Sequence, residues 1–301
     1  MHTARDALGP SECAFVPRRL GLTQIVGLLV LGRALLYVTV LVFVGIAIAT
    51  RGIDAARAWQ LVLGDPLPLG AAQLAALTAV IVLGTSLVPG EVEPARTLGL
   101  ERVPSRELVL ALLAGLGLQL PMVQLTTWLV HALPFLARPA EVDAAIEAVT
   151  RMSSPLRALT VPLSFIVIPA LTEELLFRGL VQRSLRERFG PRAAIGITAV
   201  LFGAFHMDAQ ALFFASTMGV LLGVLAERSG STLPGVALHA GFNALPVLLP
   251  RDLVVIAGFN DGSDADLPLG WALGSTLFAL AALVGLFVLV GRRPPAEEHE
   301  P

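Results

Sequence analysis

Long stretches without a charged residue constrain this chain more than any other feature of its sequence. Each of the eight stretches between clusters of charge is a candidate for one helix of the roughly 20 residues that cross a bilayer. They cover residues 34–50, 66–90, 108–137, 158–172, 193–207, 209–226, 229–250 and 267–291. Charged residues make up only 15% of the chain, against about 25% in ordinary soluble proteins. The pattern predicts an all-α polytopic membrane protein of about eight transmembrane helices and excludes a water-soluble enzyme.

The basic residues indicate an orientation and exclude one class of partner. All 21 of them are Arg, which favours a GC-rich coding sequence and hence a bacterial inner membrane. With the N-terminus inside, thirteen arginines fall in inner segments and six in outer ones. Because cytoplasmic loops collect Lys and Arg, we expect both termini in the cytoplasm. Only residues 183–192 form a basic tract, so the broad cationic face that nucleic acid requires is missing and we expect no nucleic-acid partner.

The motifs divide the chain into two halves. Residues 1–150 are predicted to form an N-terminal membrane region with three transmembrane helices and no motif, and residues 151–301 a catalytic core with five. Between the third and fourth helices, apolar residues recur at helical spacing, which predicts a short interfacial helix; a solvated linker is the alternative. The apolar residues are Val142, Ile146 and Val149.

Ionisable residues inside apolar helices are costly, so each needs a partner, water or a function. Three of them follow the fourth apolar stretch, in the sequence LTEELLFRG of residues 171–179. Glu174 and Arg178 are four residues apart and can pair on one helix face. Glu173 points about 100° away, as a turn of 3.6 residues requires, and is available as a general base. The alternative is a helix end in the cytoplasm with both glutamates solvated.

Two further polar positions lie in later helices. Phe202 precedes His206 by four residues, and His239 precedes Asn243 by four, so each pair shares a helix face. The fifth and sixth helices are short for a span, so we expect a hairpin with Asp208 at its tip. Hydrogen bonding between helices would also explain these side chains. A base, two imidazoles and a carboxamide together, however, are a sufficient set for hydrolysing an amide in an intramembrane cavity.

The ordered set EExxxR, FxxxH and HxxxN resembles the CPBP family of intramembrane proteases. That family includes CAAX prenyl endopeptidases of the Ras-converting-enzyme type and bacteriocin-processing and self-immunity proteins. The resemblance covers about the C-terminal half and implies an eight-helix architecture. It implies that Glu173 activates water, that Glu174 and Arg178 support it, and that Asn243 donates to the oxyanion. The two histidines would orient the water or polarise the scissile carbonyl.

The same residues leave two mechanisms open. Glu173, His206 and His239 would satisfy a zinc site of two histidines and one carboxylate with an open position for water. They also fit a mechanism in which glutamate alone deprotonates water and His and Asn form the oxyanion hole. We favour the second, without a cofactor, because no two ligands share a helix in the manner of HExxH and because a carboxamide already supplies the electrophile.

These inferences predict an intramembrane endopeptidase. Its substrate would be a membrane-anchored or lipidated protein, cut near its C-terminus or in a leader, because a soluble peptide gains little by entering the bilayer. A catalytically silent scaffold or bacteriocin immunity protein is one alternative. A proton-coupled transporter is another, but the outer half of the helices offers only His131 and Asp208 as relay groups, too few for a path across the membrane.

Overall fold

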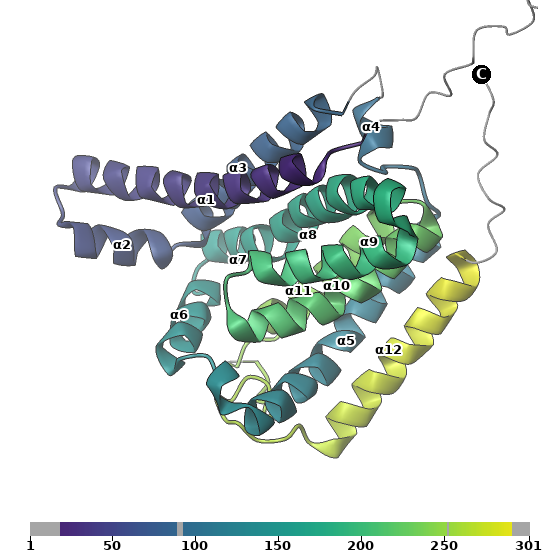
Figure 1. Cartoon of the computed structure of the whole chain (residues 1–301). Helices are drawn as coiled ribbons and strands as arrows, with labels where there is room; N and C mark the ends of the chain where they lie inside the picture. Colours follow the sequence, from purple (N-terminus) through teal and green to yellow (C-terminus); the bar gives the residue numbers. More distant parts are fainter. Residues whose placement is uncertain (1–18, 89–92, 252, 291–301) are drawn as a thin grey trace, which may run out of the picture.

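The computed structural model describes residues 19–88, 93–251 and 253–290. Every regular element in these residues is a helix (Figure 1). In chain order the elements are α1 (Leu22–Arg51), α2 (Ala55–Leu63), α3 (Pro66–Ser86), α4 (Pro94–Thr97), α5 (Ser105–Ala132), the 3₁₀ turn η1 (Pro134–Leu136), α6 (Ala140–Thr150), α7 (Pro155–Pro162), the π-helical segment η2 (Leu163–Val167), α8 (Ile168–Glu174), the π-helical segment η3 (Leu175–Gln182), α9 (Arg183–Phe205), α10 (Ala209–Ser229), α11 (Leu233–Leu248) and α12 (Leu269–Val290).

The all-helical, polytopic class is confirmed, with a different count of spans. Six helices in the described part of the chain are long and apolar enough to cross a membrane. The expected eight are reached only by counting α11, which has 16 residues, and by dividing the continuous run Pro155–Phe205 into two. The division falls at Gly190, whose φ of 78° is not helical, with Pro191 directly after it. Glycine tolerates this conformation and proline cannot continue a helical hydrogen-bond ladder.

The ends of the helices around the site follow from capping residues. Asp208 begins α10 by accepting a hydrogen bond at Oδ1 from the backbone N–H of Ala211, 2.6 Å away, as an N-cap carboxylate does. α9 and α10 pack against each other, with Asp208 in the turn between them, so the expected hairpin is confirmed. Ser154 caps α7 in the same manner. Within the run that α7 begins, the short helix α8 lies between two π-helical segments, a feature often found at functional sites.

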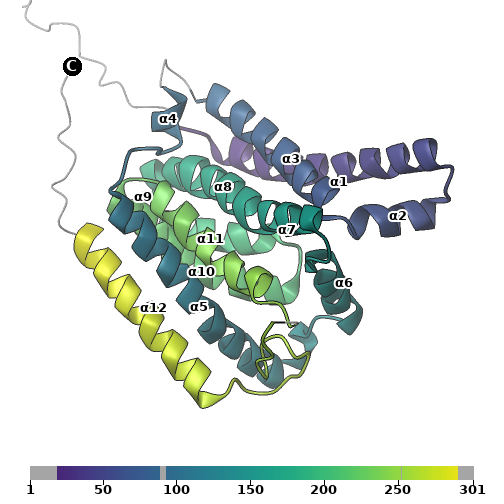
Figure 2. The same cartoon turned by 180° about the vertical axis from the view of Figure 1, so that it is seen from behind.

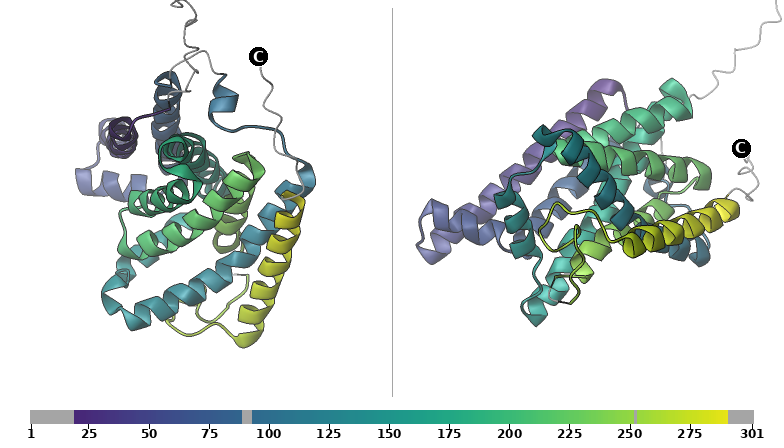
Figure 3. Two further views of the ribbon diagram at one scale, coloured as in Figure 1. Left: turned by 45° about the vertical axis from the view of Figure 1, so that its right-hand side comes forward. Right: turned by 90° about the horizontal axis from the view of Figure 1, so that it is seen from below.

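Helix packing around the site depends on close backbone approaches. α11 lies against α5, and α12 covers the other side of α5 (Figures 1 and 2). A Cβ added at Gly115 of α5 would collide with the backbone of Leu238, and one at Gly241 of α11 would collide with Leu112. Small residues at such contacts are typical of packing within membranes, where van der Waals fit replaces the hydrophobic effect. α1, α2 and α3 extend to one side of this bundle (Figure 3).

Segments predicted to lie on the cytoplasmic side contact one another. Arg183 donates from Nη2 to the carbonyl of Gly230 at 2.7 Å. The N–H of Thr232 donates to the carbonyl of Gly99 at 2.8 Å. The turn after α4, the start of α9 and the turn before α11 thus meet at one end of the bundle, as the arginine distribution requires.

Segments predicted to lie on the outer side also contact one another. Arg138 pairs with Asp208, with 3.3 Å between Nε and Oδ2. Asp266 accepts from Gln124 at 2.6 Å and from Trp128 at 2.9 Å. The grouping matches the predicted topology, while the side of the membrane that each end faces stays a prediction.

The predicted short helix between the third and fourth apolar stretches exists as α6. Of the residues that predicted it, Val149 is buried, whereas Val142 and Ile146 are exposed. Its position at the membrane surface stays a prediction, as does the division of the chain at residue 150. The two halves are in direct contact, because α3 packs against η2 and α8.

Candidate active site

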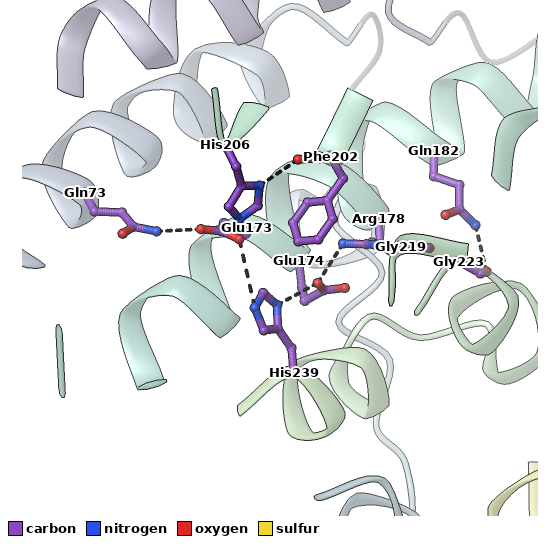
Figure 4. Close-up of polar contacts among 10 residues, drawn as sticks. All are labelled: Gln73, Glu173, Glu174, Arg178, Gln182, Phe202, His206, Gly219, Gly223 and His239. Atoms are coloured by element: carbon purple, nitrogen blue, oxygen red, sulfur yellow. Dashed lines mark hydrogen bonds and ion pairs between the residues drawn. The ribbon is translucent and has the colours of Figure 1, made fainter. Parts of the chain in front are cut away.

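All six candidate residues lie on the helices around one small region. Glu173 and Glu174 end α8, Arg178 lies in η3, His206 follows α9, and His239 and Asn243 are one turn apart on α11. Figure 4 shows the carboxylate of Glu173 with His206 above it and His239 below it. The structure thus brings together residues separated by up to 70 positions, as the motif pattern predicted.

Glu174 and Arg178 form the expected pair. Oε1 of Glu174 accepts from Nη1 of Arg178 at 2.7 Å, and both side chains are fully buried. Arg178 also donates from Nη2 to the carbonyl of Gly219 at 3.2 Å, and its guanidinium lies 4.5 Å from the ring centre of Phe202. A buried charge is costly unless it is paired and hydrogen-bonded. These contacts supply that pairing and hold η3, α9 and α10 together.

Glu174 also orients the imidazole of His239. The same Oε1 lies 3.0 Å from Nδ1 of His239. A carboxylate only accepts, so this hydrogen bond places the imidazole proton on Nδ1 and leaves Nε2 as the acceptor in the neutral ring. Nε2 faces Oε2 of Glu173 at 4.0 Å. That separation is too long for a direct hydrogen bond and of a length that a bridging water can span.

One carboxylate oxygen of Glu173 accepts a hydrogen bond, and the other has no hydrogen-bond partner among the described residues. Its side chain is buried, with 7% of the residue exposed. Oε1 accepts from Nε2 of Gln73 at 2.8 Å. Oε2 is buried without a hydrogen-bond partner among the described residues, and it is the atom that faces His239. A buried polar atom without a partner is costly, which indicates a position for substrate or water.

The ring of His206 is fixed by the helix that carries it. Its Nδ1 lies 2.9 Å from the carbonyl of Phe202, and because a carbonyl only accepts, Nδ1 carries the proton and Nε2 is the acceptor in the neutral ring. The ring of Phe202 makes edge-to-face contacts with both histidines, with centroid distances of 5.1 Å to His206 and 5.9 Å to His239. The aromatic residue of the FxxxH motif therefore packs against both imidazoles.

A cavity of about 220 Å³ adjoins these groups. Four residues with polar side chains, Arg138, His206, His239 and Asn243, line it. The rest of the wall is mainly apolar, formed by Phe202, Ala211, Phe214, Ala215, Met218, Leu222 and Phe242. A few polar groups converging on an apolar hollow are typical of a ligand site.

Arg138, one of the residues that line this cavity, pairs with two carboxylates. Its Nε contacts Asp208 at 3.3 Å and its Nη1 contacts Asp143 at 3.1 Å. Burial lowers the pKa of Arg138, but the hydrogen bonds that it donates to these two carboxylates outweigh this effect and raise its pKa above the usual value. The guanidinium is charged at every working pH and ties α6 to the tip of the α9–α10 hairpin.

The donor set was also compared with what a metal ion requires. In the described ranges, no three His, Cys, Asp or Glu side chains are grouped closely enough to hold a metal ion. Of the zinc ligands considered from the sequence, Glu173 and His239 face each other with 4.0 Å between Oε2 and Nε2. His206 and His239 both hydrogen-bond through Nδ1 and keep Nε2 available, an orientation that metal-ligating histidines also adopt. The mechanism without a metal therefore stays a prediction.

Comparison with protein families bears on this region directly. Residues 155–245 match the model of the type II CAAX prenyl endopeptidase Rce1-like family. The site-bearing region is therefore similar to the Rce1-like family. The match includes all six candidate residues and confirms the resemblance to the CPBP proteases seen in the motifs. Searches of curated proteins and of solved structures gave no match. The Rce1-like match and the apolar helices support an integral membrane endopeptidase of the CAAX-protease type.

Two residues of this region were not predicted from the sequence. Gln73 is the only amide side chain in the apolar stretch 66–90, and a buried amide in a membrane helix is a signal that could have identified it. Arg138 ends the third apolar stretch and was counted only as a loop charge. Both lie outside the region that matches the Rce1-like family, so no motif pointed to them.

Proposed function

We propose that this protein is an intramembrane endopeptidase in which Glu173 activates water to cleave a membrane-anchored or lipidated protein near its C-terminus or in a leader. One observation carries the proposal: the uncommitted Oε2 of Glu173 faces Nε2 of His239 at 4.0 Å. The adjoining cavity is also lined by His206 and Asn243. A general base must lie within reach of the proton it abstracts, directly or through one water.

The hydrogen bonds around the site support a division of roles. His239 donates from Nδ1 to Glu174, and His206 donates from Nδ1 to the carbonyl of Phe202, so each neutral ring offers Nε2 as an acceptor. The attacking water has two protons, so it can donate one to Glu173 and the other to one of these two rings. Glu173 takes the proton from this water as its oxygen attacks the scissile carbonyl. The amide of Asn243 is then the donor available to the developing oxyanion, and the proton on Glu173 passes to the leaving amine.

The surroundings support a membrane-bound substrate. The cavity wall is mainly apolar, and the outer faces of α1 and α12 carry many exposed aliphatic side chains, as helices in contact with lipid do. A peptide that is anchored in or attached to the bilayer already lies at this depth. We place the protein in a bacterial inner membrane with both termini in the cytoplasm, and we propose that it acts without a metal cofactor.

Glu173→Gln is the decisive substitution, because it keeps the size of the side chain and removes its ability to accept a proton. We expect it to abolish cleavage by protein reconstituted in liposomes. Two internally quenched probes cover the substrate classes: a peptide with a prenylated C-terminal cysteine motif, and a single-span peptide with a C-terminal extension. Glu147→Gln, at an exposed site on α6, is the matched control and should cleave as wild type.

Two results would contradict the proposal. Near-normal turnover by Glu173→Gln would remove Glu173 from the role of base. If a chelator abolished turnover and zinc restored it, a metal-dependent mechanism would replace the metal-free one. A silent scaffold predicts instead that the C-termini of membrane proteins are identical in cells with and without this protein.

A further inference from the structure

Gln73 is the contact between the N-terminal half of the chain and the candidate base. It lies on α3, a helix without a charged residue, and its Nε2 donates to Oε1 of Glu173 at 2.8 Å. Figure 4 shows it reaching Glu173 from its own helix, apart from those that carry the two histidines. One hundred positions separate the two residues, and Gln73 lies outside the segment with the family match.

The packing of α3 explains how this amide reaches the site. A Cβ added at Gly70 would overlap the side chain of Ser164 in η2, so the glycine allows α3 to lie directly against the run that carries Glu173. Gly70 and Gln73 are three residues apart and share a helix face. Ala72 and Ala76 are buried beside them. The close approach is therefore built into α3 on the face that presents Gln73.

The hydrogen bond decides which carboxylate oxygen can act. With Oε1 accepting from Gln73, the oxygen that faces His239 is Oε2, which has no partner in the described part of the chain. Four other charged or titratable groups surround Glu173: Glu174 and Arg178 on its own run, His206 after α9, and His239 on α11. The hydrogen bond to Oε1 comes from Gln73 and not from any of these groups. A neutral amide can hold this carboxylate without neutralising it, unlike an arginine.

We infer that Gln73 is a positioning residue for the proposed reaction: it holds Glu173 so that Oε2 points at the water between the base and His239. The inference rests on the proposed function, in which Glu173 is the base. It assigns a catalytic contribution to the half of the chain that carries no family motif. The competing explanation is that Gln73 only holds two helices together.

The first test replaces Gln73 by Met, which is similar in length but has no donor. We expect kcat on the quenched single-span peptide in liposomes to fall about 10- to 100-fold, as loss of a hydrogen bond to a charged group implies. KM should change little, because Gln73 contacts Glu173 and does not line the cavity. The matched control is Gln182→Met: Gln182 is also buried and donates to the carbonyl of Gly223, away from Glu173. It should lose thermal stability without this loss of kcat.

The second test separates positioning from packing by pH. Gln73→Glu keeps the shape but can donate to Glu173 only when the new carboxyl is protonated. Its turnover relative to wild type should therefore rise as the pH falls, whereas the ratio for Gln73→Met should stay low throughout. A ratio for Gln73→Glu that does not vary with pH, or a Gln73→Met variant that melts early but keeps wild-type kcat, would overturn the inference.

A third measurement does not depend on turnover. The infrared difference between wild type and Glu173→Gln isolates the carboxylate stretch of Glu173, whose frequency depends on hydrogen bonding. Gln73→Met should shift this band and Gln182→Met should not; an unshifted band would refute the contact.

If the band shifts but neither wild type nor variants cleave the probes, the proposed function fails while the contact stands. If wild type cleaves and Gln73→Met matches it in kcat, the positioning role fails while the function stands.

Discussion

The buried carboxylates of Glu173 and Glu174 show how neighbouring residues of one type take different roles. Glu174 has a structural role, since its Oε1 accepts hydrogen bonds from both Arg178 and His239. Each glutamate keeps its Oε2 without a hydrogen-bond partner in the described residues, but it is Oε2 of Glu173 that faces Nε2 of His239. Adjacent positions on a helix point about 100° apart, so Glu174 reaches Arg178 and Nδ1 of His239, while Glu173 faces Nε2 of His239. We therefore expect Glu174→Gln to reduce turnover less than Glu173→Gln.

Asn243 offers a prediction at the same scale. Loss of one preorganised oxyanion donor costs about 10²- to 10³-fold in turnover, whereas loss of a hydrogen bond between membrane helices costs roughly 0.6 kcal/mol on average. Asn243→Ala should therefore lower kcat by about 10²- to 10³-fold with little change in melting temperature. Asn243→Asp should be no better, because an anion repels the oxyanion. A variant that melts early yet cleaves normally at low temperature would assign Asn243 to packing instead.

At the scale of elements, the α9–α10 hairpin connects the site to the outer loops. His206 stands at the end of α9, and Asp208, two residues later, both caps α10 and pairs with Arg138. Met207 between them has a positive φ of 58°, an uncommon conformation for a residue with a side chain. The turn that carries His206 is therefore held by the Asp208 cap and by its ion pair with Arg138, rather than by favourable local geometry.

Substitutions at Asp208 should separate the cap from the charge. Asn caps helices about as well as Asp, so Asp208→Asn should keep α10 intact and lose only the ion pair with Arg138, which is partly exposed and contributes about 0 to 1 kcal/mol. Asp208→Ala loses both, and removing the cap costs about 0.5 to 2 kcal/mol more. Thermal unfolding in detergent measures the difference; equal melting of the two variants would contradict the capping role.

The ion pair of Asp208 with Arg138 also predicts how the stability of the fold responds to acid. Burial raises the pKa of Asp208, but hydrogen bonds from the Ala211 backbone and from Arg138 outweigh it and hold the pKa below its usual value of 3.8. A lowered folded-state pKa means that the contribution to stability is complete above about pH 4 and is lost as the pH falls below it. Wild type should lose this contribution on acidification, and Asp208→Asn should show no corresponding loss.

At the scale of the whole molecule, contacts between loops support a topology with alternating sides. The start of α9, the turn before α11 and the turn after α4 meet at one end, while Arg138, Asp208 and the loop before α12 belong to the other. This grouping requires the run Pro155–Phe205 to reverse at Gly190 and α11 to be counted as a crossing. A short α11 is compatible with this arrangement because it packs in the interior of the bundle, against α5.

Reporter fusions can test this topology at one informative position. Both six and eight crossings place the two termini on the same side, so terminal fusions alone do not distinguish them. A reporter fused after residue 230 should be cytoplasmic if the run divides at Gly190, and periplasmic if Pro155–Phe205 crosses once. Fusions at both termini should be cytoplasmic because of the arginine distribution. A periplasmic C-terminus would contradict the orientation.

Much of the architecture was predictable because membrane insertion imposes a simple rule on the sequence. Charge is excluded from apolar spans, so gaps between charged residues locate the helices, and even the short α6 was visible from helical spacing. The number of spans is less certain from helix length alone, because Gly190 turns the chain inside one continuous helical run, Pro155–Phe205, and because α11 has only 16 residues. Gln73 and Arg138 were missed because a lone amide and a loop arginine carry no local pattern.

The sequence by itself determined that this chain is an all-helical membrane protein, where its helices lie, and which six residues stand in the order of the CPBP motifs. Hydrophobicity and i,i+4 spacing are local properties, so no folded structure is needed to read them. Only the tertiary structure decided that Glu174, not Glu173, holds His239, that each imidazole commits Nδ1, and that Gln73 donates to the base. Those contacts join residues 65 to 100 positions apart, or depend on ring orientation, and the packing of α3, α8 and α11 alone fixes them.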